Sequence, residues 1–313
     1  MIDISLQNFE SDLINASMQQ PMLLDIWAPW CGPCKALGPL LEKLEVAYAG
    51  RFKLAKLNAD EQADISGQLS QMFGVRSIPF CVMFKDGQPV DGFVGALPEN
   101  EIRAFLDKHV PSADEAAADE DVQDAAALLA EGDTESALQK LREAVALDPG
   151  NDTARFDCLR ALLTLGHVAE ARSVFEPVAN KVVPDARLSA CGHWLAACES
   201  VPSAASPEAL AQAIAANRRD FEARFALAQS HFAAQRLTQA MDDLLEIVMR
   251  DKAWNGELAR KTYVAILELM AKPAAKAEAA TPKGALEVAG KINIPAADPV
   301  LDAYRRKLSM ALF

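Results

Sequence analysis

The first third of the chain alternates between short apolar runs and segments with apolar residues at helical spacing. The runs 22–27 and 52–57 predict strands, the second by its alternation with a period of two. Residues 80–94 contain two further apolar runs around a Lys-Asp-Gly-Gln turn, which is typical of a β-hairpin. A last helix is predicted at about 98–109. This pattern predicts an α/β domain over residues 1–110.

The rest of the chain has a different pattern. Residues 111–120 are small and acidic, without large apolar side chains, and we interpret them as a linker that runs into a helix start. From 121 to 271 strand signals almost vanish, and Ala- and Leu-rich helical spacing is broken by Gly, Pro and Asn turns, which predicts short paired helices. Residues 272–297 form a low-complexity insertion. Residues 298–313 place their apolar side chains on one helix face and predict a C-terminal apolar helix.

The helical region contains an internal repeat. Ala137 and Ala171 are 34 residues apart, and Ala240 fits the same register. This spacing resembles that of tetratricopeptide repeats (TPRs), in which small residues let paired helices approach closely and stack into a solenoid. An irregular helical bundle is the alternative. The units lie at about 118–151, 152–185 and 221–254, with a degenerate copy at 186–220 and an extra helix at 255–271.

Composition narrows the classes of function. Asp and Glu number 44 against 31 Lys and Arg, a formal net charge of −13, so no basic face for nucleic acid is predicted. The N-terminus lacks a leader pattern and no stretch of ~20 apolar residues follows, so we expect a cytoplasmic protein without a membrane partner. Six cysteines are too few for a secreted disulfide framework.

Two cysteines, Cys31 and Cys34, are the candidate chemical centre because only two residues separate them and they lie between a predicted strand and a predicted helix. A helix N-terminus favours a thiolate, so Cys31 is the predicted nucleophile and Cys34, one turn further on, the resolving thiol. A zinc site is the alternative, but no second cysteine pair lies nearby. We therefore expect no metal and no cofactor other than a redox-active Cys31–Cys34 disulfide. Cys81 is interpreted as a small buried hydrophobe, with a third redox thiol as the alternative.

Residues 1–109 resemble thioredoxin, through Trp30-Cys31-Gly32-Pro33-Cys34-Lys35, Asp25, Lys56, Ile78-Pro79 and Gly95-Ala96. The resemblance implies that Asp25 accepts the proton of Cys34 and that Lys56 modulates Asp25. It also implies a cis peptide at Ile78–Pro79, facing the cysteines. The candidate substrate-binding residues are Trp30, Gly32, Pro33, Ile78, Pro79, Gly95 and Ala96.

TPR helices line a concave groove, and in family terms the fifth, ninth and twelfth positions of a unit tend to face it. At these positions the chain is mostly apolar, which favours nonnative or hydrophobic ligands, with packing between helices as the alternative. His167 and His231 have no carboxylate at an obvious spacing and are assigned no chemistry. The candidate groove residues are Phe156, Arg160, Leu163, Phe225, Gln229 and Phe232.

The whole chain resembles the bacterial YbbN/CnoX chaperedoxin family. The resemblance implies a holdase that binds unfolding or oxidised client proteins, protects their thiols by mixed-disulfide exchange and passes them to the GroEL/GroES chaperonin. Thioredoxin reductase or glutathione are possible recycling partners. Two other functions stay open: a thioredoxin-type thiol-disulfide oxidoreductase whose repeats select substrates, and a noncatalytic scaffold.

Overall fold

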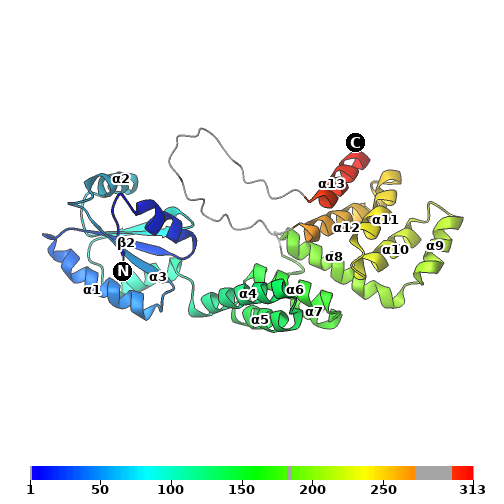
Figure 1. The fold of residues 1–313 in the computed structure, drawn as a ribbon, viewed down its shortest axis with the longest axis horizontal. Coiled ribbons are helices and arrows are strands. Elements are labelled where there is room, and N and C mark those ends of the chain that lie inside the picture. The colour runs from blue at the N-terminus through cyan, green and yellow to red at the C-terminus, as the bar shows by residue number, and fades with distance from the viewer. Residues whose placement is uncertain (1, 182–184, 272–297, 313) are drawn as a thin grey trace. The chain divides into compact units, whose positions relative to one another are not determined.

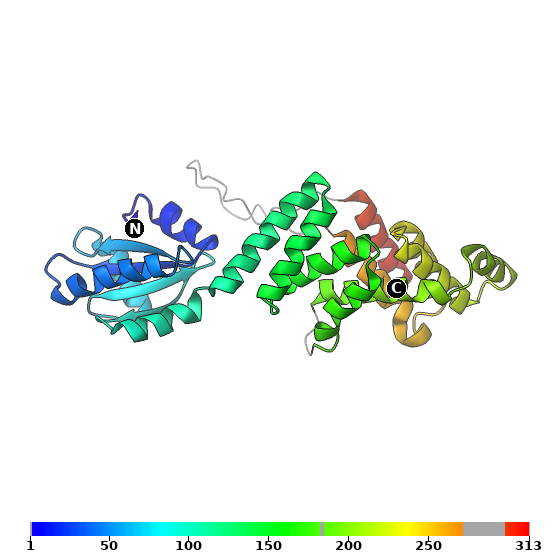
Figure 2. The same cartoon turned by 90° about the horizontal axis from the view of Figure 1, so that it is seen from below.

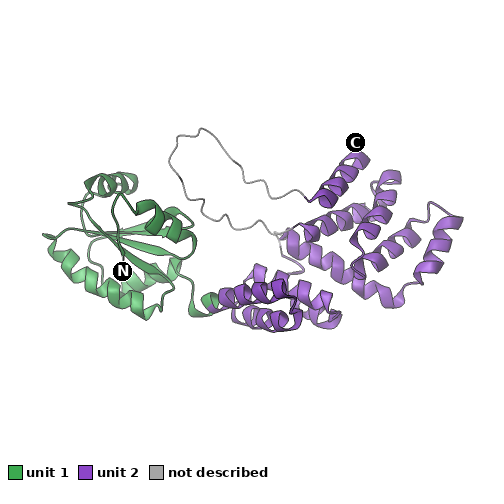
Figure 3. Ribbon diagram, viewed as in Figure 1, with its two compact units in different colours: residues 1–116 green, residues 117–313 purple. Residues whose placement is uncertain are grey.

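The computed structural model describes residues 2–181, 185–271 and 298–312. The chain divides into two compact units, residues 1–116 and 117–313 (Figure 3). The predicted low-complexity insertion at 272–297 lies outside the described residues. No described helix is long and apolar enough to cross a membrane.

The first unit is built on a five-stranded mixed sheet in the order β1-β3-β2-β4-β5 (Figure 1). β3 pairs in parallel with β1 and β2, whereas β4 runs antiparallel to both β2 and β5. β2 is therefore the central strand, with the predicted hairpin at one side. The strands are β1 (Ile2–Asp3), β2 (Met22–Trp27), β3 (Lys53–Asn58), β4 (Phe80–Lys85) and β5 (Gln88–Val94).

Helices enclose β2 from both faces. Leu23 lies in one apolar core with Leu37 of α1 and Ile102 of α3, and its neighbour Leu24 lies in another with Leu13 and Leu69. This alternation follows from the two-residue period of a strand, and it explains why the run at β2 is almost continuously apolar. The helical elements are η1 (Phe9–Asn15, a π-helical segment), η2 (Ala16–Met18), α1 (Gly32–Ala47), α2 (Ala63–Phe73) and α3 (Glu99–His109).

The predicted linker at 111–120 is helical from Ala113 onward, because α4 runs from Ala113 to Glu131. Ser112 and Glu115 form a capping box: the Glu115 N–H donates to Ser112 Oγ at 3.1 Å, and the Ser112 N–H donates to the Glu115 carboxylate at 2.7 Å. The alanines that follow favour helix more than any other residue. The small, acidic composition therefore marks a helix start, and the boundary between the two units falls inside α4.

In the described part of the second unit, all regular elements are helical. Neighbouring helices pack side by side, α5 against α6 and α10 against α11, as Figure 1 and, from below, Figure 2 show. After α4 these elements are α5 (Thr134–Leu147), α6 (Asp152–Thr164), α7 (Val168–Phe175), η3 (Glu176–Val178), α8 (Ala186–Ser200), η4 (Val201–Ser203), α9 (Pro207–Ala216), α10 (Phe221–Ala233), α11 (Leu237–Arg250), α12 (Trp254–Met270) and α13 (Pro299–Leu312).

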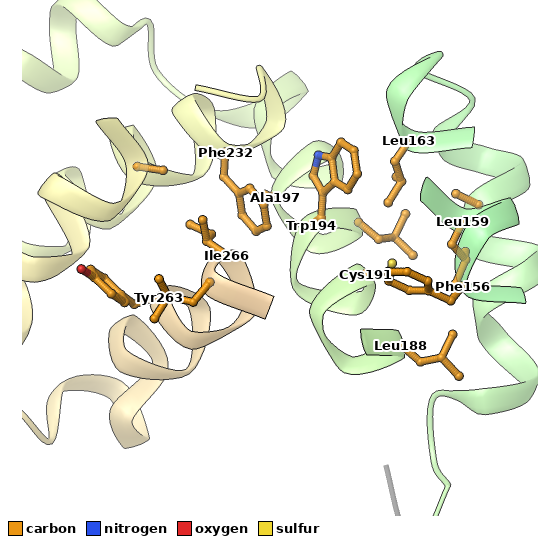
Figure 4. Close-up of a cluster of buried hydrophobic side chains, with 14 of the residues drawn as sticks. Phe156, Leu159, Leu163, Leu188, Cys191, Trp194, Ala197, Phe232, Tyr263 and Ile266 are labelled. Carbon is orange, nitrogen blue, oxygen red and sulfur yellow. The ribbon is translucent and has the colours of Figure 1, made fainter. Parts of the chain in front are cut away.

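A continuous apolar core links most of these helices, and part of it is drawn in Figure 4. Ala137, Ala171 and Ala240, the three alanines of the repeat register, are fully buried in it. In the same core, Trp194 of α8 stacks on Phe232 of α10, with ring centroids 6.3 Å apart and planes inclined by 17°. Small side chains at the repeat positions therefore allow the close helix approach that the sequence predicts.

The last helix, α13, packs on α11 and α12. Leu301, Tyr304 and Leu308 are its buried residues. The Tyr304 hydroxyl donates to the Asp242 carboxylate of α11 at 3.1 Å, and the buried Tyr263 hydroxyl of α12 donates to the Tyr304 carbonyl at 2.9 Å. The apolar face of α13 thus covers the end of the helical unit.

Candidate functional site

The two cysteines of the motif form a disulfide at the start of α1. Cys31 is the N-cap residue of α1, and its sulfur accepts a hydrogen bond from the Cys34 N–H at 3.2 Å. Each cysteine is only 4% exposed. An amide donor and a helix N-terminus both stabilise negative charge on a sulfur. The assignment of Cys31 as nucleophile and of Cys34 as resolving thiol stays a prediction.

The central strand β2 places a carboxylate, Asp25, in the interior of the sheet. Its side chain is 1% exposed. In the register of the sheet, Asp25 pairs with Lys56 of β3 on one side and with Cys81 of β4 on the other. Burial raises the pKa of Asp25 from 3.8 to about 6, against the opposing effects of the Lys56 charge and a hydrogen bond from Cys81.

Lys56 acts on Asp25 through its charge, since its ammonium is hydrogen-bonded elsewhere. Its Nζ donates to Glu42 Oε1 of α1 at 2.6 Å. A Cβ atom at Gly38 would lie 3.5 Å from that Nζ, so the ammonium lies directly beneath α1. Because Gly38 is four residues after Cys34, it lies on the same side of α1, one turn further along. The roles of Asp25 and Lys56 toward Cys34 remain predictions.

The Ile78–Pro79 peptide is cis, as the resemblance implies. Ile78 packs against Cys31 and Cys34, and the Pro79 carbonyl accepts a hydrogen bond from the Gly95 N–H at 2.8 Å. Of the predicted substrate-binding residues, Pro79 is buried and Ile78 and Gly95 are half-buried. Those exposed to solvent are Trp30, Gly32, Pro33 and Ala96.

Trp30 presents the largest exposed apolar surface beside the disulfide. It is 70% exposed, and its indole Nε1 donates to the Asp60 carboxylate at 3.0 Å. This hydrogen bond, which the sequence analysis missed, restricts the orientation of an exposed ring. Trp30, Gly32 and Pro33 thus form a partly apolar exposed surface next to the two cysteines in sequence, and their role in substrate binding stays a prediction.

The predicted TPR groove is not an open apolar surface. Phe156, Leu163, Phe225 and Phe232 are 0–8% exposed and belong to the core of the helical unit, while Arg160 is exposed and Gln229 half-buried. The physical reason is that α6 and α10 each contact helices on more than one side, so their apolar stripes pack between helices. Arg160 instead lies with its guanidinium 5.4 Å from the Phe156 ring centre.

His231, to which the sequence analysis assigned no chemistry, has a carboxylate partner at a spacing that the sequence does not make obvious. Its Nδ1 lies 3.1 Å from Asp243 Oδ2, and Arg224 reaches the other oxygen of Asp243 at 3.5 Å. The spacing of 12 residues crosses the turn from α10 to α11 and cannot be recognised from a single helix period. These contacts tie two packed helices together, so they are structural.

Comparison with known proteins agrees with this geometry. Residues 1–108 match the family described as thioredoxin, and residues 128–190 and 201–280 match two families described as tetratricopeptide repeat. A thioredoxin from Haemophilus influenzae is 42% identical over 110 residues, 35% of this chain and 97% of that protein. Thioredoxin 2 from Chlorobaculum tepidum is 45% identical over 104 residues, 33% of this chain and 90% of that protein. The chain belongs to the thioredoxin family.

The predicted fold class, an α/β thioredoxin fold followed by an all-α TPR-like domain, is thereby confirmed. Thioredoxins use the cysteine pair itself as their redox group, without a separate cofactor, so the Cys31–Cys34 pair is the active site of the thioredoxin domain. The chain is a thioredoxin-like redox protein with an additional helical domain.

One close contact at this site was not predicted. Cys81 Sγ lies 3.8 Å from Asp25 Oδ1, and both side chains are buried. The sequence places Cys81 two residues after Pro79 but does not reveal which residue of β2 it faces. That depends on the register of two strands that are not consecutive along the chain.

Proposed function

We propose that this thioredoxin–TPR protein is a redox-active holdase of the cytoplasm. It binds unfolding or oxidised client proteins, protects their thiols through mixed disulfides and passes them to the GroEL/GroES chaperonin. The observation that carries the proposal is the presence in one chain of a dithiol at a helix N-terminus and a TPR domain. The chaperonin as recipient rests on the resemblance to chaperedoxins.

The redox step follows from the geometry at α1. The Cys31 thiolate attacks a client disulfide, which forms a Cys31–client disulfide and releases one client thiolate. Cys34 then loses its proton to Asp25, and its sulfur attacks Cys31 Sγ. The Cys31–Cys34 bond forms while the client sulfur leaves as a reduced thiolate. Thioredoxin reductase or glutathione returns two electrons to the pair for another cycle.

The client surface is proposed to lie on apolar side chains that the fold leaves exposed. In the thioredoxin domain these include Trp30 and Val94, which are 70% and 41% exposed. In the TPR domain they include Met249, Val264 and Met310, on the three helices that pack together at the C-terminal end. Exposed apolar side chains favour contact with nonnative chains, and the net charge of −13 helps to keep such complexes in solution.

The proposed cytoplasmic location is supported by the thiols outside the active site. Cys81, Cys158, Cys191 and Cys198 are all free in the structure. Free cysteines are typical of a reducing compartment, in which the Cys31–Cys34 pair can also be recycled.

The holdase activity is tested by light scattering from a chemically denatured client, without ATP. We expect near-stoichiometric suppression of aggregation by the wild-type protein and by a Cys31→Ala/Cys34→Ala variant, because the apolar surface does not depend on the thiols. Complete loss of suppression in that variant would contradict an independent holdase surface.

The redox and chaperonin parts are tested with a trap. In Cys34→Ala, no second thiol is present to break the disulfide between Cys31 and a client. These mixed disulfides therefore accumulate in oxidatively stressed cells, and the captured proteins can be identified after purification. The matched control is Cys31→Ala/Cys34→Ala, which retains the free cysteines of the rest of the chain. Absence of Cys31-dependent adducts refutes the redox role, and absence of the chaperonin among noncovalent partners refutes the proposed transfer.

A second function, a disulfide reductase whose TPR domain selects substrates, is favoured by the 42–45% identity to two thioredoxins. The two proposals differ in turnover. A reductase reduces many disulfides per protein molecule when thioredoxin reductase and NADPH are supplied. A holdase instead suppresses the aggregation of an amount of client that is proportional to the amount of holdase. A noncatalytic scaffold is the weakest alternative, because it has no use for an ionisable group buried in the centre of the thioredoxin sheet.

A further inference from the structure

Three ionisable side chains lie in one row across the centre of the thioredoxin sheet. Lys56 of β3, Asp25 of β2 and Cys81 of β4 are paired directly in the strand register. Directly paired residues of neighbouring strands point to the same face of a sheet. Cys81 and Leu23 lie in the core that contains α1, so the row faces the helix that carries the active-site pair.

Cys81 makes a specific contact within this row. Its Sγ lies 3.8 Å from Asp25 Oδ1, and the two side chains are 0% and 1% exposed. Burial and the neighbouring Asp25 charge raise the pKa of the Cys81 thiol well above its usual range, so the sulfur keeps its proton. The S–H is therefore the donor and the carboxylate the acceptor.

The other partner in the row does not compete for this oxygen. Lys56 is held by Glu42 at 2.6 Å and affects Asp25 through its charge. A valine at position 81 would fill a similar space without donating a hydrogen bond. The contact thus gives Cys81 a chemical function that packing alone does not require.

We propose that Cys81 is a positioning residue for the dithiol reaction, whose S–H engages Oδ1 of Asp25 and leaves Oδ2 to receive the proton of Cys34. The inference rests on the proposed function, in which Asp25 is the proton acceptor. As the Cys34 sulfur bonds to Cys31 Sγ, its proton moves to Asp25 Oδ2, and the bond between Cys31 and the client sulfur breaks. Cys81 keeps its own proton throughout.

The hydrogen bond stabilises the ionised form of Asp25, so its removal is expected to raise the pKa of Asp25. Without the donor, the carboxylate binds its proton more tightly and is less available as an acceptor near neutral pH. A weak donor to a buried charge corresponds to a shift of about half to one pH unit in the titration of Asp25. A stronger donor at the same position shifts the titration in the opposite direction.

The experiment compares Cys81→Val and Cys81→Ala, which lack the donor, with Cys81→Ser, which keeps one. The full-length oxidised chain is titrated by NMR of the Asp25 carboxyl carbon, and the reduced chain is assayed for reduction of the aromatic disulfide DTNB as a function of pH. We expect both midpoints to rise by about half to one pH unit in the Val and Ala variants and to stay or fall in the Ser variant.

Two outcomes overturn the inference. In the first, the Cys81→Val variant has the same titration midpoints as the wild-type protein. In the second, the midpoints of Cys81→Ser and Cys81→Ala shift together, so that the shift follows side-chain size and not the presence of a donor. If the Val variant does not fold, the Ser and Ala variants still give the comparison. Asp25→Asn separates this inference from the proposed function. If that variant leaves the pH profile of DTNB reduction unchanged, the acceptor role of Asp25 fails; if it abolishes the inflection while Cys81→Val does not move it, only the role of Cys81 fails.

Discussion

Asp25→Asn is expected to stabilise the thioredoxin domain at neutral pH but not at acidic pH. Burial raises the pKa of Asp25 from 3.8 to about 6, so the folded state binds this proton more tightly than the unfolded state. The protonated carboxyl therefore contributes fully to stability below about pH 4. That contribution is lost as the pH rises through 6, where the buried group ionises.

The magnitude follows from the two pKa values. A difference of about two pKa units corresponds to about 3 kcal/mol in the free energy of unfolding. Asparagine has nearly the same shape but no ionisation, so this pH dependence is absent from the variant. Any constant cost of the extra amide hydrogens is the same at every pH and drops out of the comparison.

The assay is native-state amide hydrogen exchange of β2 in the oxidised full-length chain, measured by mass spectrometry at a series of pH values and corrected for intrinsic exchange. Exchange from this central strand reports opening of the thioredoxin domain separately from the helical unit. The difference in opening free energy between Asp25→Asn and wild type should grow by about 2–3 kcal/mol between pH 4 and pH 8. A difference that stays constant over this range refutes the reasoning.

Three further changes probe the fold, each by hydrogen exchange or denaturation of the full chain. Gly192→Ala places a Cβ 2.6 Å from the Phe175 ring and should lower the free energy of unfolding by about 1–3 kcal/mol. The control Gly67→Ala has open space around its Cβ in α2 and should be neutral or stabilising. Equal stability of the two variants contradicts the packing seen around α8. Ser112→Ala removes half of a capping box and should cost about 1 kcal/mol, seen as faster exchange in the first turn of α4 but not in α5. Tyr304→Phe removes hydroxyl contacts to α11 and should weaken the packing of α13 by about 1 kcal/mol; unchanged exchange in α13 argues against those contacts.

Much of the fold is predictable because its signals are local. The run at β2, the hairpin around Lys85–Gln88 and the recurring alanines each identify an element within a short window of sequence. Two elements were not predicted: β1, which has only two residues, and α2, an 11-residue helix that buries only Ile65, Ser66 and Leu69. The helix start within 111–120 was anticipated, but its exact position at Ala113 was not, because a capping box and a polar linker share the same residue types.

For a similar reason, the sequence predicts some features of the candidate site and not others. The positions of Cys31 and Cys34 follow from a motif, and the motif lies where a strand meets a helix. The partner of Asp25 depends on strand register, and the burial of Phe156 and Phe232 depends on how many helices surround each one. Such properties arise from tertiary packing, and helical spacing alone does not distinguish a groove face from an inter-helix face.

The buried carboxylate itself argues for chemistry over docking in the thioredoxin domain. At neutral pH its ionised form lowers the free energy of unfolding by about 3 kcal/mol, a large fraction of the stability of an ordinary domain. Lys56 and Cys81 lower its pKa while burial and Glu42 raise it, which leaves the group titrating close to neutrality. A proton acceptor is most effective when its pKa lies near the working pH. A domain used only to dock partners gains nothing from an ionisable group in the centre of its sheet. A dithiol that must release the Cys34 proton does gain from it. We therefore infer that the thiol–disulfide exchange reaction accounts for the presence of Asp25.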